Sequence, residues 1–347
     1  MSATLPDTAR AATIEMSALG GARALVAGLR ELAARDEAGV LAVVVDSSGS
    51  TYRKPGALIL VDAAGVRVGA LSGGCLEAEL EMHARAVLAH GVAGDVRFDT
   101  SGDEDRVFGS GTGCGGSTRV LLLPLPALSS PLRDALLDAD ARGLGTVLAL
   151  SSTETGCGVA SVGIARYAFD QRGARETAER AIIDAITLAI APARRVLLLG
   201  AGPETRPLLA FTRLLGWYIE LAEHRERWLR FAADNGVARL HRDGPELLVE
   251  LLATSRFDAA LVMNHNVHLD ARCLGHLAAS GVPYVGLLGP PARRDDLLAE
   301  LGTEKTGQLR QRLHAPVGLS LGGEGAEAIA LAIVAQLQCE FSRHARG

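Results

Sequence analysis

The sequence predicts an α/β protein in which an N-terminal α/β domain precedes a C-terminal doubly wound parallel sheet. In residues 195–341, short apolar runs alternate with segments of helical periodicity, a pattern typical of parallel strands covered by helices. The segment Gly200-Ala-Gly202 ends the first of these runs and opens a helical segment, as the phosphate-binding turn of a dinucleotide domain does. The second domain is therefore predicted to be Rossmann-like.

The length of 347 residues favours two domains, and a content of 48% hydrophobic and 22% charged residues is typical of globular proteins. The net charge of −5, with Lys and Arg scattered along the chain, argues against nucleic acid as a partner. No apolar run is long enough to cross a bilayer, and the first residues lack the pattern of a signal peptide. Five cysteines do not make a disulfide framework, which favours a reducing, cytoplasmic setting.

Helices are predicted where apolar residues recur every third or fourth position, and strands where short apolar runs are bounded by turn residues. In chain order the first half has a helix at 16–35, strands at 40–45, 57–61 and 66–71, a helix at 76–90, strands at 96–100 and 119–124, a helix at 129–142, a strand at 145–150 and a helix at 175–190. The segments 46–50 and 101–117 are rich in Gly, Ser and Asp and are predicted loops. Residues 159–166 fit neither pattern clearly.

In the second half, the predicted elements alternate. They are a strand at 195–200, a helix at 203–215, strands at 217–222, 258–263 and 283–288, and helices at 292–301 and 324–341. We therefore expect an N-terminal domain over 1–128, a middle segment over 129–192 that either side could include, and a C-terminal domain over 193–347.

Two cysteines stand in glycine-rich turns, which are Ser72-Gly73-Gly74-Cys75 and Gly113-Cys114-Gly115-Gly116. Glycine allows a positive φ and leaves room for a ligand close to the backbone. A thiolate there suits a soft metal or reactive sulfur chemistry, whereas the alternative is that each cysteine is a small buried hydrophobe. Cys75 is expected at the start of helix 76–90, with Glu77 in the first turn, where the helix dipole favours negative charge. Cys273 and Cys339 lie in helical patterns and are predicted packing residues.

The loop that follows strand 40–45 carries the hydroxyls of Ser50 and Thr51 and the guanidinium of Arg53. Hydroxyls, backbone donors and Arg together suit an anionic group such as phosphate. The alternative is a polar surface loop.

In the second half, Gly200 and Gly202 supply two of the three glycines of a dinucleotide fingerprint. Glu223 stands about twenty positions later, where an acidic side chain holds the ribose hydroxyls of NAD. His265 follows the strand 258–263 and is a candidate ligand contact or proton carrier, because ligands bind outside the carboxyl ends of parallel strands. The alternative is a Rossmann scaffold that binds another group or nothing.

These motifs together resemble the XdhC/CoxI family, the xanthine dehydrogenase accessory factors. The motifs in the first half are Gly49-Ser-Thr-x-Arg53-x-Pro-Gly56, Gly69-x-x-Ser-Gly-Gly-Cys-Leu-Glu77 and Gly113-Cys-Gly-Gly116. Those in the second half are Leu199-Gly-Ala-Gly202, Met263-Asn-His265, Tyr284-Val-Gly-Leu-Leu-Gly289 and His314-Ala-Pro-Val-Gly-Leu319. The resemblance covers nearly the whole chain in the same order, and it implies an XdhC-type N-terminal domain and a Rossmann C-terminal domain.

The resemblance implies an accessory protein that binds molybdenum cofactor (molybdopterin), protects it, supports its sulfuration by a cysteine desulfurase and delivers it to a molybdenum hydroxylase. By position, Cys75 and Cys114 are the implied metal-facing and catalytic residues. The implied cofactor-binding residues are Ser50, Thr51, Arg53, Ser72, Gly73, Gly74, Glu77, Gly113 and Gly115. A homodimer is expected by analogy.

The chain departs from the family pattern in the nucleotide crevice. The family usually has His where Pro203 stands and Gly or Ala near Thr205. It usually has Asp where Glu223 and Asn266 stand, and Gly-Ser-Arg where this chain has Gly289-Pro290-Pro291. Two other functions compete with a maturation chaperone. One is an NAD(P)-dependent oxidoreductase with His265 as its proton carrier, and the other is a thiol-metal or redox-sensor protein without pterin.

Overall fold

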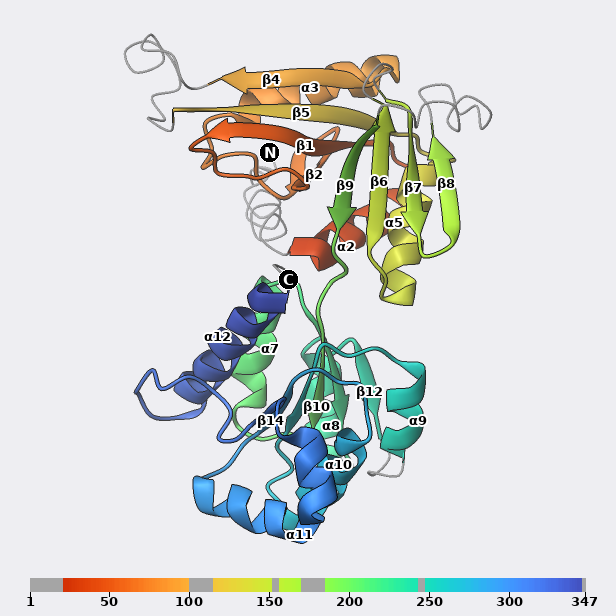
Figure 1. Ribbon diagram of the computed structural model, residues 1–347. Coiled ribbons are helices and arrows are strands. Elements are labelled where there is room, and N and C mark those ends of the chain that lie inside the picture. The colour runs from red at the N-terminus through yellow and green to blue at the C-terminus, as the bar shows by residue number, and fades with distance from the viewer. Residues whose placement is uncertain (1–20, 100–114, 152–155, 170–184, 243–246, 345–347) are drawn as a thin grey trace, which may run out of the picture. The chain divides into compact units, whose positions relative to one another are not determined.

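The computed structural model of the chain describes residues 21–99, 115–151, 156–169, 185–242 and 247–344 (Figure 1). The chain divides into two compact units, residues 1–193 and 194–347, and each is described by itself. Residues 129–192, the middle segment of the sequence, lie in the first unit.

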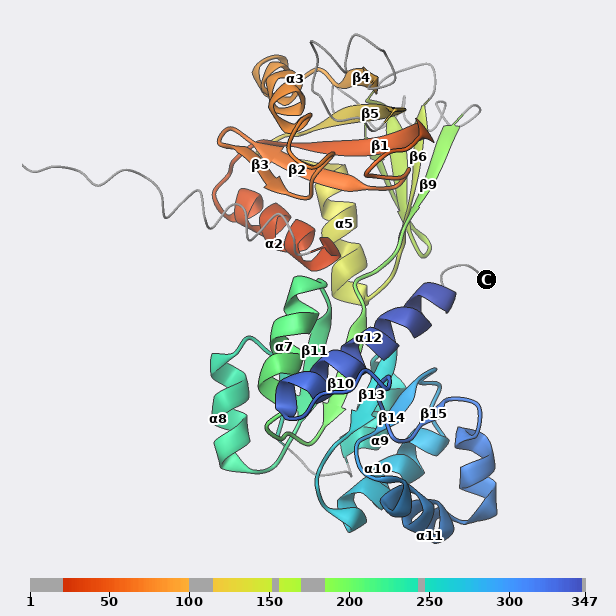
Figure 2. The ribbon, with the colours of Figure 1, turned by 90° about the vertical axis from the view of Figure 1, so that its left-hand side faces the viewer.

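The first unit is built around an antiparallel five-stranded sheet with the order β3-β2-β1-β5-β4. Its strands are β1 (Gly39–Gly49), β2 (Leu58–Asp62), β3 (Gly65–Val68), β4 (Gly94–Asp99) and β5 (Gly116–Leu125). Alternate side chains of β1 point to opposite faces, so that Leu41 and Val43 pack toward helices α2 (Gly21–Ala34) and α5 (Pro131–Arg142). Ala42 and Val44 pack toward α3 (Glu77–His90) on the other face (Figure 2).

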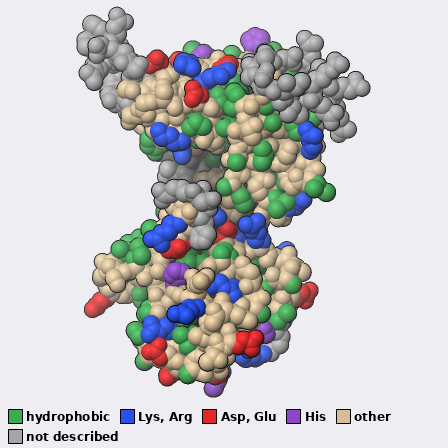
Figure 3. Space-filling view, in the orientation of Figure 1, with side chains coloured by type: hydrophobic (Ala, Val, Ile, Leu, Met, Phe, Trp, Pro, Cys, Tyr) green, Lys and Arg blue, Asp and Glu red, His purple; other side chains and the backbone are tan. Residues whose placement is uncertain are grey.

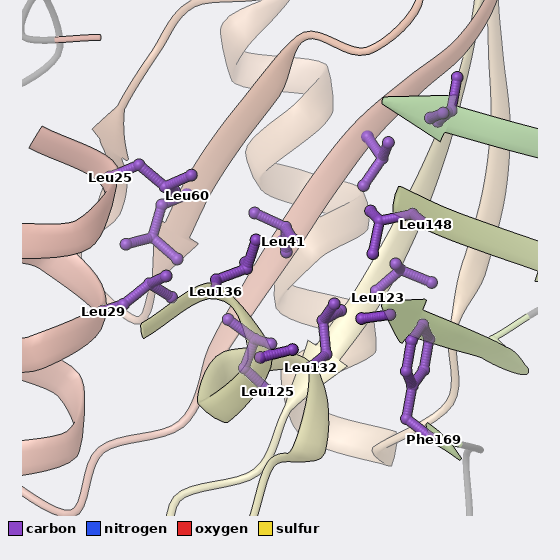
Figure 4. Packing of buried hydrophobic residues seen from close by; sticks show 14 of the residues in the cluster. Leu25, Leu29, Leu41, Leu60, Leu123, Leu125, Leu132, Leu136, Leu148 and Phe169 are labelled. Atoms are coloured by element: carbon purple, nitrogen blue, oxygen red, sulfur yellow. The ribbon is translucent and has the colours of Figure 1, made fainter. Parts of the chain in front are cut away.

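A second, four-stranded antiparallel sheet of this unit has the order β8-β7-β6-β9. Its strands are β6 (Thr146–Ser151), β7 (Gly158–Val162), β8 (Ala165–Phe169) and β9 (Ala185–Ile190). Helix α5 joins the two sheets in one apolar core, in which Leu132 and Leu136 lie among Leu41, Leu123 and Leu148 (Figure 4).

In this unit the structure differs from the sequence analysis at three segments. The predicted helix 175–190 is wrong for residues 185–190, which form strand β9 and pair with β6. This run contains Ile and Thr, which favour strands, and a short apolar run fits helix and strand periods alike. The predicted loop 46–50 is strand as far as Gly49, because β1 keeps pairing with β5 to its end. Residues 159–166, which fitted neither pattern, belong to the β7–β8 hairpin.

The second unit is a parallel sheet with the order β12-β11-β10-β13-β14-β15. The strands are β10 (Arg195–Leu199), β11 (Tyr218–Ala222), β12 (Arg239–His241), β13 (Ala259–Val262), β14 (Val285–Leu287) and β15 (Leu313–His314). The helices are α7 (Thr205–Leu214), α8 (Glu226–Asp234), α9 (Leu247–Thr254), α10 (Val267–Ala278), α11 (Pro291–Leu309) and α12 (Ala326–His344). Separate apolar cores join α7 and α12 to one face of the sheet and α9, α10 and α11 to the other (Figure 2). The predicted doubly wound α/β fold is confirmed.

The strand order reverses between the neighbours β10 and β13. After β10 the chain continues to a helix on one face of the sheet, and after β13 it continues to a helix on the other face. Ligands of open α/β sheets bind at such a point, outside the carboxyl ends of the strands. The Gly200 turn follows β10 and His265 follows β13, so the fold brings both predicted motifs to this crevice. No helix among the described residues is long and apolar enough to cross a membrane.

Candidate functional site

The Cys75 turn is fixed by one hydroxyl. Ser72 Oγ accepts hydrogen bonds from the backbone N–H groups of Gly74, Cys75 and Leu76, at 3.2, 3.0 and 3.0 Å. Leu76 is the N-cap of α3, so this hydroxyl ties the turn to the start of the helix. The hydroxyl of Ser72 is thus engaged inside the turn, and the thiol of Cys75 is left exposed at its surface.

Glu77 holds Ser72 in place from the first turn of α3. Its Oε1 accepts from the N–H groups of Leu71 and Ser72 at 3.0 and 2.8 Å, and its Oε2 accepts from Ser72 Oγ at 2.6 Å. Burial raises the pKa of this carboxyl, but the hydrogen bonds from Ser72 and Leu71 outweigh it, so the pKa lies below its ordinary value of 4.5. Glu77 therefore positions the turn as a carboxylate.

The glycines of this turn are open to their surroundings. A Cβ built on Gly73 or Gly74 would meet no described atom within 4 Å, and Gly74 has a φ of +117°, which disfavours other residues. Among the described residues, nothing therefore crowds the backbone beside Cys75.

Three segments predicted to share a site lie against one another in the first unit. Arg53 Nε donates to Ala70 O at 2.7 Å, which ties the loop after β1 to the segment that leads into the Cys75 turn. A Cβ on Gly116 would lie 2.4 Å from Ser50 O, so β5 starts in direct contact with the same loop. Within the loop, Thr51 Oγ1 donates to Arg53 O at 2.9 Å.

Gly115, which has a φ of +53°, is the first described residue of the second predicted turn. Cys114 and Gly113 lie outside the described residues, so their predicted roles stay predictions. Among the described residues no three His, Cys, Asp or Glu side chains are grouped as a metal site would require.

The remaining cysteines differ in exposure. Cys273 is buried in α10, and burial raises the pKa of its thiol to about 11, as expected for a packing residue. The prediction that Cys339 packs is wrong, because its side chain is exposed on α12. The buried seam of this helix runs through Ile333, Leu337 and Phe341, and a position two residues from Leu337 faces away from that seam.

In the second unit, the turn after β10 lies directly against the segment after β13. A Cβ on Gly200 would lie 2.5 Å from Asn264 Cα, and one on Gly202 would lie 2.4 Å from His265 Nε2. The turn and the His265 segment are therefore packed closely against each other.

Glu223 does not present a free carboxylate for a ribose. Its side chain is fully buried and accepts five hydrogen bonds, from the N–H of Ala201, His224 and Arg225 and from Arg225 Nε and Nη2. Burial raises the pKa of this carboxyl, but the hydrogen bonds from Arg225 outweigh it and lower the pKa. Because Arg225 Nη2 also donates to Ala201 O, the pair clamps the glycine turn to the end of β11.

His265 has a φ of +55°, which is uncommon for a residue other than glycine. Its Nε2 lies 3.8 Å from Glu204 Oε2. Asp270, fully buried in α10, fixes the preceding residue by accepting from Asn264 N–H and Nδ2 at 3.2 and 3.0 Å. The other Asp270 oxygen pairs with Arg293.

Four charged residues that fix the two turns were not predicted from the sequence. They are Glu204, Arg225, Asp270 and Arg293. Arg225 had a sequence signal, because a cation two positions after the acid predicted to bind a ribose is close enough in the chain to pair with it. On the face shown in Figure 3, basic and acidic side chains are interspersed within each unit.

Two protein-family models match the chain, one in each of its two units. The model of the XdhC and CoxI family matches residues 32–99, and that of the XdhC Rossmann domain matches residues 196–337. A probable xanthine dehydrogenase subunit from Bacillus subtilis is 26% identical over 321 residues, which are 87% of this chain and 92% of that protein. The uncharacterized protein YqeB of Escherichia coli is 28% identical over 145 residues, 41% of this chain and 26% of that protein.

Among solved structures, that of a xanthine dehydrogenase from Bacillus halodurans is similar with a TM-score of 0.72 and 30% sequence identity. The match covers 92% of this chain and 96% of that chain. With both family models in the expected order and a related fold over nearly the full length, the chain belongs to the XdhC and CoxI family.

Proposed function

We propose that this protein is a maturation factor that binds molybdenum cofactor in its first unit, protects it, supports its sulfuration and delivers it to a molybdenum hydroxylase of the xanthine dehydrogenase type. The single observation that carries the proposal is the Cys75 turn, where an exposed thiol stands on a backbone held rigid by Ser72 and Glu77. The names of two relatives, both xanthine dehydrogenase proteins, support the class of client.

The described residues fit such a group in chemistry and in space. The thiol of Cys75 is a soft donor, and Gly73 and Gly74 leave the space beside it open. Ser50 is exposed next to Gly116, and Arg53 carries a positive charge on the same loop, which suits the phosphate of the pterin tail. When bound, the cofactor supplies a molybdenum centre whose terminal oxo ligand is exchanged for sulfur.

In this proposal each residue has a limited task. Cys75 contacts the metal or its sulfur, and Cys114 is the second thiol expected there. Ser72 and Glu77 position the turn, and Arg53 holds the anionic tail. Because the turn is fixed before any ligand arrives, little ordering entropy opposes binding.

The test of delivery is the co-expression of the full chain with a molybdenum hydroxylase and a cysteine desulfurase, followed by measurement of the sulfurated, active fraction of the hydroxylase. The Cys75→Ser variant is expected to lower this fraction to the level seen without the protein. The Cys339→Ser variant also removes an exposed thiol, but from α12, and is the matched control that should leave the active fraction unchanged. Equal active fractions with wild type and Cys75→Ser would contradict the proposal.

The alternative function, a thiol-metal or redox-sensor protein without pterin, is tested by metal and pterin analysis of the purified chain. Bound zinc or copper in the absence of pterin fluorescence would favour the sensor. The expected homodimer is tested by light scattering of the purified chain.

A further inference from the structure

The Rossmann architecture of the second unit implies a dinucleotide such as NAD(P), bound outside the carboxyl ends of β10, β11 and β13. Such a domain holds its cofactor in three ways. An acidic side chain accepts from the ribose hydroxyls, backbone N–H groups of the glycine turn donate to the pyrophosphate, and the second glycine leaves space for the pyrophosphate to approach. A dinucleotide fits only where all three are free.

The acidic side chain at the ribose position is Glu223, and its carboxylate is already saturated. A carboxylate offers about four lone-pair positions to donors. Glu223 receives five donors, which are the backbone N–H groups of Ala201, His224 and Arg225 and the Nε and Nη2 of Arg225, at 2.6–2.9 Å. The side chain has no exposed surface. A ribose hydroxyl would therefore find neither a free lone pair nor a path to this carboxylate.

Arg225 is not free to hold the additional phosphate of NADP. In NADP-binding domains an arginine close to the acidic position faces the 2′-phosphate. Here Nε and Nη2 of Arg225 form a bidentate pair with Glu223, and Nη2 also donates to Ala201 O at 2.6 Å. The charge of the guanidinium is thus balanced by a buried carboxylate, and two of its three nitrogens donate within the turn.

The backbone donors that a pyrophosphate needs are engaged or missing. The N–H of Ala201 donates to Glu223 Oε2 at 2.9 Å. The N–H of Gly202 donates to Thr205 Oγ1, and that of Thr205 donates to Gly202 O, both at 3.0 Å. Residue 203 is proline and has no N–H. At most one N–H of residues 201–205 therefore remains for a phosphate.

The space beside the second glycine of the turn is occupied by side chains. A Cβ on Gly202 would lie within 2.5 Å of His265 Nε2 and of Glu204 Oε2, so these two side chains stand where the pyrophosphate would approach the backbone. Glu204 is buried, so water screens its carboxylate little, and the carboxylate repels a phosphate at this distance.

We propose that the second unit is a Rossmann scaffold whose dinucleotide site is filled by its own side chains, so that it works without NAD(P). Glu223 and Arg225 close the ribose position, and Glu204 and His265 close the pyrophosphate position. The oxidoreductase alternative consequently loses its cofactor site. These residues lie in the second unit, so the proposal does not rest on the cofactor role proposed for the first.

The test is calorimetric titration of the full chain with NAD⁺, NADP⁺ and ADP at up to about 1 mM, and we expect no saturable binding by wild type. Thermal unfolding gives a second reading, because a ligand that binds the folded state raises Tm. None of the three nucleotides should raise the Tm of wild type. Saturable binding of any of them, or a rise in Tm with any of them, would overturn the proposal.

A variant of Glu223 separates a structural carboxylate from one that waits for a ribose. Glu223→Ala removes the acceptor of Arg225 and of the Ala201 N–H, so it should lower Tm by at least about 6 °C, with or without NAD⁺. The matched control is Glu250→Ala, which removes an exposed carboxylate from α9 and should change Tm by less than about 2 °C. Equal Tm values for wild type and Glu223→Ala would overturn the proposal.

A double variant tests what excludes the pyrophosphate. Pro203→Gly returns an N–H to the turn, and Glu204→Gln removes the negative charge beside Gly202. We expect the double variant to bind ADP saturably where wild type does not, with a cooperative thermal transition as evidence that it is folded. No binding of ADP by the folded double variant would overturn the assignment of this exclusion to Pro203 and Glu204.

Discussion

Replacement of Ser72 by alanine tests whether one hydroxyl organises the Cys75 turn. The substitution removes the acceptor of three backbone N–H groups and the partner of Glu77 Oε2. Loss of a hydroxyl at a helix start costs about 0.5–2 kcal/mol. Because Gly74 and Cys75 are exposed and their N–H groups can turn to water, we expect a cost of about 1 kcal/mol.

The assay combines scanning calorimetry with amide hydrogen exchange. A loss of about 1 kcal/mol in a unit of this size lowers Tm by about 2–4 °C. The amides of residues 74–76 should exchange about fivefold faster, since about 1.4 kcal/mol corresponds to a factor of ten. The control is Ser342→Ala, which removes a hydroxyl that donates to Gln338 O within α12 and should not alter exchange at 74–76. Unchanged exchange in Ser72→Ala would refute the reasoning.

Three further predictions rest on the same contacts. The folded-state pKa of Glu77 is depressed, so its contribution to stability is present above pH 4.5 and is lost as the pH falls through the lowered pKa. The Tm of wild type should therefore fall more than that of Glu77→Gln between about pH 6 and pH 3, and parallel curves of Tm against pH would contradict this. Gly200→Ala places a Cβ 2.5 Å from the backbone Cα of Asn264 at a φ of +90°, and should destabilise the second unit by about 1–3 kcal/mol in urea unfolding, whereas an unchanged midpoint would contradict the packing. Iodoacetamide at about pH 8 should label exposed Cys75 in the folded chain and buried Cys273 only after unfolding, and equal labelling rates would show that the burial is wrong.

In the second unit the sequence predicts β10, β11, β13, β14, α7, α11 and α12, because short apolar runs alternate there with segments of helical period. It offers no prediction for α8, α9, α10, β12 or β15. The same method fails at residues 185–190. Their strand is decided by pairing with β6, a partner more than thirty residues earlier, and no local pattern contains that information.

For the site, sequence reasoning finds the Cys75 turn because glycine, cysteine and a first-turn acid are adjacent in the chain. It assigns Ser72 and Glu77 to ligand binding, whereas their side chains bind each other and the backbone of the turn. It also assigns Glu223 to a ribose, because the spacing of the motif does not show that Arg225 and the N–H of Ala201 donate to this carboxylate. Hydrogen-bond partners depend on side-chain direction, which a motif does not specify.

The central claim is that the exposed thiol of the first unit holds a molybdenum-bearing pterin. The most direct measurement is the amount of molybdenum and of pterin per chain in protein purified from cells that make the cofactor. We expect molybdenum and pterin together in near-equal amounts in wild type and in Cys339→Ser, and we expect both to be lost in Cys75→Ser. Wild-type protein that carries neither, or Cys75→Ser protein that retains both, would contradict the claim.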